Sequence, residues 1–303
     1  MPTPRTCVRA LLPLILFATL LSCEDPIDVP TNFEGPQLVV EAWLTNESVP
    51  QTITLTETQE FYDSALPGGV AGAEVVVCRG TDATDCAVFE AQGNGRYVWT
   101  PPFPGAVLGE VGETFTLGFE LDGERYASQT VMKATAEIDS LSFQFEEEAL
   151  GLEEGFYAQL YARDQPGRGD TYLIRTTFND TLLLRPSEIN TSFDGVFDAG
   201  TDADGNTFIF PIRFRINKVD EDGAPVALVE GDSLSIEVWS ISTEAFVFLN
   251  VAAEQIANGD SGIFGVPVAN SPGNVLNVNT GEPILGIFNV AEVARVERVF
   301  EGE

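Results

Sequence analysis

The first third of the chain alternates apolar and polar residues with the two-residue period of half-buried β-strands. In Gln51–Glu57, isoleucine and leucine alternate with threonines, so one face of this predicted strand is expected to be buried and the other wet. The run Leu38–Leu44 is also rich in β-branched and aromatic residues. Turn signals at Gly93–Gly95 and Asp122-Gly123 separate further strands. Short strands without a helical period predict a β-sandwich over residues 35–135.

After a junction near Lys133–Asp139, the pattern predicts a second β-rich region. We expect further strands at Phe156–Arg163, Thr171–Phe178, Phe208–Lys218 and Leu234–Ser240, and a last one near Ile284–Phe288. One helix is predicted near residues 243–258, with Ser242 or Thr243 as its cap. Its apolar residues recur at helical spacing, and Asn258-Gly259 ends it.

The N-terminus has the parts of a bacterial export signal. Arg5 and Arg9 form a positive region, and the apolar run Ala10–Leu21 that follows is too short for a permanent membrane span. The run ends in Leu20-Leu21-Ser22-Cys23, which resembles the lipobox cut by lipoprotein signal peptidase. Cys23 is therefore expected to carry acyl chains such as palmitate, which anchor a protein stably when several are present. An ordinary secretory signal with a chance cysteine is the alternative.

The chain thus divides into predicted segments, and the lipid is its only predicted membrane attachment. These are a signal peptide at 1–22, a lipidated tether at 23–34, a β-sandwich domain at 35–135, and a second β-rich domain with one packed helix at 136–303.

The composition is strongly acidic. The formal net charge is −32, and Lys133 and Lys218 are the only lysines. Such a body repels nucleic acid and anionic lipid surfaces, which argues against a nucleic-acid role. The excess of carboxylates favours either a cationic partner, such as a metal ion, or simply a soluble surface suited to a salty habitat. The second interpretation is preferred, because a charge bias over a whole chain rarely marks a site.

Cys78 and Cys86 bracket a polar turn between two β-rich runs. In an oxidising compartment this spacing predicts a disulfide across a hairpin, which for so short a loop contributes about 2–3 kcal/mol. Two free thiols are the alternative. A metal site here is not expected, because the chain has no histidine and this region has no third cysteine.

Catalytic patterns are missing from the sequence. Ser-His-Asp and Cys-His arrangements are excluded by the absence of histidine, and neither lysine lies in a Ser-x-x-Lys pattern. Paired carboxylates could act as the acid and base of a glycoside hydrolase, but 47 acidic residues form many such pairs and the sequence singles none out. We therefore expect no enzymatic activity and no cofactor.

The acidic segment Asp198–Asn206 places oxygen-bearing side chains with the alternation of a calcium loop. It lacks the distal glutamate of such loops, because the apolar stretch Phe208–Ile212 occupies that position. A polar connecting loop is the preferred interpretation, and a calcium site is the alternative.

Four triplets fit the Asp-Ser/Thr-apolar pattern that Bacteroidota use for O-glycosylation. The candidate acceptors are Ser64, Ser140, Thr181 and Ser233. A turn residue that leads into a strand produces the same triplet, so this alternative stays open.

Several segments, taken in order, resemble a known family. After Cys23 they are Leu38–Leu44, Gly72–Val76, Gly95–Tyr97, Gly112–Leu117, Tyr126-Ala127, the helix Glu244–Gly259, Gly262–Phe264 and Ile284–Phe288. Their order and spacing resemble the Bacteroidota outer-membrane lipoproteins grouped as domain of unknown function 4249, along nearly the whole chain after the signal.

The resemblance implies a mainly β fold whose N-terminal domain is a sandwich of the immunoglobulin-like or carboxypeptidase-regulatory-like kind. It also implies an outer-membrane, lipid-anchored location with possible exposure at the cell surface, and genes that often neighbour a TonB-dependent receptor. It supplies no catalytic residues. The leading hypothesis is a non-catalytic accessory or ligand-binding partner of a TonB-dependent β-barrel receptor in nutrient uptake, with an unknown ligand. The alternative is a structural or adhesive cell-envelope lipoprotein without a transport role.

Overall fold

The computed structural model describes residues 35–60, 63–82, 84–196, 205–259 and 271–302. All of these except Glu60 and Asp63 belong to one compact unit, which is described below. The predicted signal peptide, Cys23, the tether and the acidic residues Asp198, Asp202 and Asp204 lie outside the described residues.

The fold is mainly β, as predicted. The strands form a nine-stranded mixed barrel with smaller sheets, and the described part of the chain adds two short helices. The barrel strands are β1 (Leu38–Thr45), β2 (Gln51–Glu57), β3 (Glu74–Arg79), β4 (Asp85–Gly93), β5 (Arg96–Trp99), β6 (Thr114–Leu121), β7 (Glu124–Val131), β14 (Val275–Asn277) and β15 (Pro283–Ala291). Around the barrel they follow the order β1-β15-β14-β7-β6-β3-β4-β5-β2.

The barrel interior follows from the two-residue alternation of its strands. On β2, Ile53 and Leu55 are fully buried, while the threonines on either side of them are only half-buried. The same alternation places Phe115, Leu117 and Phe119 of β6 inside. Because successive side chains of a strand point to opposite faces, these rows meet in one continuous apolar core.

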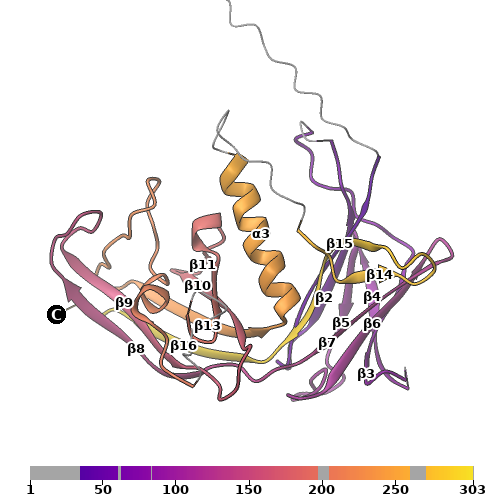
Figure 1. Ribbon diagram of the computed structural model, residues 1–303, viewed down its shortest axis with the longest axis horizontal. Coiled ribbons are helices and arrows are strands. Elements are labelled where there is room, and N and C mark those ends of the chain that lie inside the picture. The colour runs from indigo at the N-terminus through magenta and orange to yellow at the C-terminus, as the bar shows by residue number, and fades with distance from the viewer. Residues whose placement is uncertain (1–34, 61–62, 83, 197–204, 260–270, 303) are drawn as a thin grey trace, which may run out of the picture. The chain divides into compact units, whose positions relative to one another are not determined.

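Two strands from late in the chain complete this barrel. β15 pairs in parallel with β1, from Val39 opposite Leu285 to Thr45 opposite Ala291. β14 pairs with β7 and with β15, and Figure 1 shows the yellow strands β14 and β15 beside the indigo and magenta strands. Residues 35–135 therefore supply β1–β7 of the barrel, and residues beyond the predicted boundary supply the rest.

The remaining elements lie between β7 and the C-terminus. They are β8 (Glu137–Glu146), β9 (Gly155–Arg163), β10 (Thr171–Phe178), β11 (Thr181–Leu182), the 3-10 turn η2 (Pro186–Glu188), β12 (Asn190–Phe193), α2 (Phe210–Phe214), β13 (Ser233–Ile241), α3 (Thr243–Gly259) and β16 (Val293–Val299). β11, β10, β13 and β16 form a sheet in that order, β12 pairs with β10, and β8 pairs with β9. Apolar side chains of these strands form a second core.

Helix α3 begins with a side-chain cap. The Ser242 hydroxyl oxygen accepts a hydrogen bond from the backbone N–H of Ala245 at 3.1 Å, which satisfies one of the free N–H groups at the helix start. Ala245 is buried in a cluster with Trp239 and Ile241 of β13. The helix therefore lies where the sequence predicts one, with Ser242 as its cap.

The predicted strand Phe208–Lys218 is wrong, because this segment contains the short helix α2 instead. Ile212 of this helix is buried, and so are Phe208 before the helix and Ile216 after it. Pro211 lies in the first turn, where its missing N–H costs no hydrogen bond. A short apolar run is compatible with either element, so its pattern alone does not distinguish a strand from a helix.

Candidate functional site

The hairpin of β3 and β4 carries a disulfide at its tip. Cys78 and Cys86 face each other in the strand register, and their sulfurs are bonded at 2.02 Å. The next pair toward the turn, Arg79 and Asp85, forms an ion pair. The disulfide thus joins the two strands directly beside the ion pair.

Three rows of inward-facing residues end at the same end of the barrel, around one hollow. On β3 the buried Val77 is followed two residues later by Arg79, and on β4 Ala87 is preceded by Asp85. On β5 the buried Tyr97 is followed by Trp99, which packs partly against the barrel core. Residues two apart on a strand share a face, so the apolar interior of the barrel ends here in a charged pair and an indole.

The loop after β5 lies at the same end. Phe103 stands between Pro102 and Pro104, and its side chain is 64% exposed. The loop is held by a hydrogen bond from the Gly105 N–H to the Ser48 hydroxyl oxygen at 2.9 Å, and by a turn bond from the Ala106 N–H to the Phe103 carbonyl. Leu108 enters the barrel core. The prolines and the buried Leu108 thus restrain the backbone of the loop that presents the exposed Phe103.

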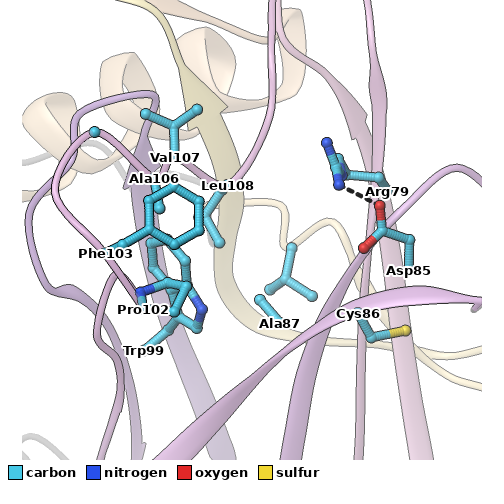
Figure 2. A pocket seen from close by; sticks show the side chains of 12 residues that line it. Arg79, Asp85, Cys86, Ala87, Trp99, Pro102, Phe103, Ala106, Val107 and Leu108 are labelled. Atoms are coloured by element: carbon cyan, nitrogen blue, oxygen red, sulfur yellow. Dashed lines mark ion pairs between the residues drawn. The ribbon is translucent and has the colours of Figure 1, made fainter.

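These residues surround a hollow of about 420 Å³ at this end of the barrel. Figure 2 shows the rings of Trp99, Pro102 and Phe103 grouped on one side and the Arg79–Asp85 ion pair on the other, with Ala87 between them. Pockets for small ligands commonly combine an apolar wall with a few oriented polar groups, and the mouth of a β-barrel is a frequent place for them.

The hollow offers both hydrogen-bonding groups and apolar faces. Arg79 supplies hydrogen-bond donors, Asp85 supplies acceptors, and the aromatic rings supply flat apolar faces. Among the described residues, no group of three or more metal-binding side chains is placed to hold a metal ion. The arrangement can therefore stack and hydrogen-bond a ligand, and it presents no nucleophile with an adjacent base.

The residues predicted from sequence lie elsewhere, apart from the cysteines. Ser64, Ser140 and Thr181 are exposed. Ser233 is half-buried, and its hydroxyl and its backbone N–H both contact the side-chain oxygen of Asn179. The sequence analysis missed Arg79, Asp85, Trp99 and Phe103. Two signals could have found them. The strand alternation places Arg79, Asp85 and Trp99 on the inward face, and two prolines flank Phe103.

A second hollow, of about 790 Å³, is a weaker candidate. It is lined by Leu182–Leu184 and by residues near Lys218, with Arg185 among them. The guanidinium of Arg185 is already bonded to the Glu188 carboxylate and to the carbonyls of Val219 and Asp220. Arg185 is therefore paired within the protein, as Arg79 is, and this hollow is the weaker candidate because no aromatic ring lines it.

A buried carboxylate lies outside both hollows. Asp164 is 2% exposed, and its two oxygens accept hydrogen bonds from the Tyr172 hydroxyl at 2.7 Å and from the Gly205 N–H at 3.2 Å. Burial raises the pKa of Asp164, and the nearby charges of Asp170 and Asp194 raise it further, although the two hydrogen bonds lower it.

This pKa shift predicts the pH dependence of stability at Asp164. Because the pKa of the folded state is raised, the folded protein binds the proton more tightly than the unfolded chain does. The stabilisation that this tighter proton binding provides is fully present below the pKa of the unfolded chain, about 3.9. It is lost as pH rises through the raised pKa of the folded protein. The side chain introduced by Asp164→Asn cannot ionise. The difference in free energy of unfolding between this variant and the native protein is therefore expected to shift in favour of the variant as pH rises from 4 to 7. Urea unfolding at both pH values measures this, and an equal difference at the two would contradict it.

In the described part of the chain, no helix is both long and apolar enough to cross a membrane. Among curated proteins, none matches this chain. The model of the family described as Domain of unknown function (DUF4249) matches residues 24–297, so the chain belongs to that family.

Proposed function

We propose that this protein is a non-catalytic binding lipoprotein of the outer membrane that assists a TonB-dependent receptor in nutrient uptake. The observation that carries the proposal is the hollow at the barrel mouth, where the aromatic rings of Trp99 and Phe103 face the Arg79–Asp85 ion pair. In a protein whose leader resembles a lipoprotein signal, such a hollow suits capture of a ligand outside the cytoplasm.

The anchor in this proposal is Cys23. Export and lipidation would leave the folded body attached to the outer membrane by acyl chains, with residues 23–34 as the tether. Ser64, Ser140 and Thr181 remain candidate O-glycosylation sites, and their exposure leaves them accessible to a transferase. An intact mass of the native protein equal to that of polypeptide plus lipid would exclude this modification.

We also propose that β1–β7 represent an immunoglobulin-like or carboxypeptidase-regulatory-like sandwich that β14 and β15 have extended. The pairing of β4 and β15 supports this interpretation. β4 pairs with β3 and β5, and β15 pairs with β1 and β14. These two strands therefore join two sets of strands that could otherwise form the separate sheets of a sandwich.

The receptor partnership is tested by affinity purification from native outer membrane through a C-terminal tag. The matched control is Cys23→Ala, which keeps the body and removes the acyl anchor. Recovery of a TonB-dependent β-barrel with the lipidated form, and its loss with the control, is the expected result. Recovery of the protein alone at native expression would overturn the transport role and favour the structural or adhesive envelope role.

A further inference from the structure

The wall of the barrel-mouth hollow is a pair of aromatic rings with different exposures. Trp99 is half-buried and anchored against the barrel core, whereas Phe103 is 64% exposed in a proline-rich loop. An aromatic side chain has only two rotatable bonds, so it loses little conformational entropy when a ligand stacks on it. The rings therefore form a prepared surface for a ligand with a flat apolar face.

The opposite side of the hollow is polar but close to neutral. Arg79 and Asp85 are paired with each other, and their side chains remain 45% and 59% exposed. A ligand with a full charge would compete with one member of this pair and leave the other without its partner. Neighbouring hydroxyl groups can instead accept from Arg79 and donate to Asp85 together, while the two residues stay paired.

We propose that this hollow binds a neutral glycan, with a sugar ring stacked on Phe103 and Trp99 and its hydroxyls bonded to Arg79 and Asp85. A pyranose ring has an apolar C–H face and a rim of hydroxyl groups, which matches the two sides of the hollow. The volume of about 420 Å³ lies within the range of small-ligand pockets and accommodates about two rings. The formal net charge of −32 disfavours acidic glycans. This inference rests on the proposed binding function and names its ligand class.

The test is calorimetric titration of the full mature protein, lipidated and in detergent. The probes are the hexasaccharides of β-1,4-glucose, β-1,4-xylose, β-1,4-mannose and α-1,4-glucose, with tyrosine and a proline-rich peptide as probes of other chemistry. We expect saturable binding of at least one hexasaccharide. Phe103→Ala is expected to weaken that binding about 5- to 10-fold through lost stacking, and Asp85→Asn about 10-fold through a lost charge-assisted bond.

The matched control is Phe145→Ala, which removes another exposed phenylalanine, on β8, far along the chain from the hollow residues. It is expected to leave affinity unchanged. Phe103 and Asp85 are exposed, so thermal unfolding of their variants should match that of the native protein, which separates lost binding from lost folding.

Absence of binding to every hexasaccharide would overturn the proposal, as would binding that Phe103→Ala leaves intact or binding of only tyrosine or the peptide. If a TonB-dependent receptor is recovered in the purification but no glycan binds, the accessory role stands and the ligand class alone fails.

Discussion

A fragment of residues 24–135, produced without the rest of the chain, is expected to remain unfolded. It contains β1–β7 but lacks β14 and β15, so β1 and β7 lose the partners that close the barrel. The missing strands also bury Val275, Phe288 and Val290 in the barrel core. Their burial contributes roughly 5–9 kcal/mol together, which is comparable with the whole stability of a small domain, about 5–15 kcal/mol.

Circular dichroism and the dispersion of amide signals in NMR spectra measure this outcome. A matched chimera joins residues 35–131 through a Gly/Ser linker of about six residues to residues 274–291, which suits a hairpin between β7 and β14. The chimera is expected to fold, whereas the same chimera with Phe288→Asp is not. A native-like spectrum from the 24–135 fragment alone would show that β14 and β15 are dispensable.

Gly286→Ala is expected to lower the free energy of unfolding by about 3–5 kcal/mol or to prevent folding. Gly286 lies on β15 opposite Val40 of β1, with a φ of +96°. A Cβ placed there would stand 1.9 Å from the Val40 carbonyl oxygen. The position of the Cβ is fixed by the backbone of β15, and the oxygen belongs to the backbone of β1. A rotamer change therefore cannot relieve the overlap, and the parallel pairing of β1 and β15 must open.

Gly281→Ala provides the matched control. Gly281 also has a positive φ, +77°, but a Cβ there would have open space around it. This variant therefore carries the cost of the left-handed backbone alone, about 1–2 kcal/mol. Urea unfolding of both variants separates the two contributions, and equal losses would contradict the close approach of β15 to β1.

Local patterns along the chain predicted much of the secondary structure. The alternation in Gln51–Glu57 corresponds to β2, and the capped apolar periodicity near residues 243–258 corresponds to α3. In both segments the burial pattern agrees with the intrinsic preference of the residues. At Phe208–Lys218 the short apolar run was compatible with either period, and the strand prediction failed there.

The candidate site was less accessible to prediction. Cys78 and Cys86 were recognisable because their spacing brackets a turn, and they are disulfide-bonded in the structure. Arg79, Asp85 and Trp99 carry no motif, and each is unremarkable beside its neighbours in sequence. Their common position follows only from the tertiary structure, which brings these three residues to the lining of one hollow.

The sequence by itself determined the β class, the positions of most strands and α3, the family, and the acidic character of the protein. The β class, the elements and the acidic character depend on composition or on periodicities within about ten residues, and the family depends on the order and spacing of segments along the chain. A linear pattern records all of these. The tertiary structure alone decided that β15 pairs in parallel with β1 and that residues from both ends of the chain share one barrel core. Partner choice between distant strands depends on which arrangement buries the most apolar surface with all backbone groups paired, and that balance is a property of the whole fold.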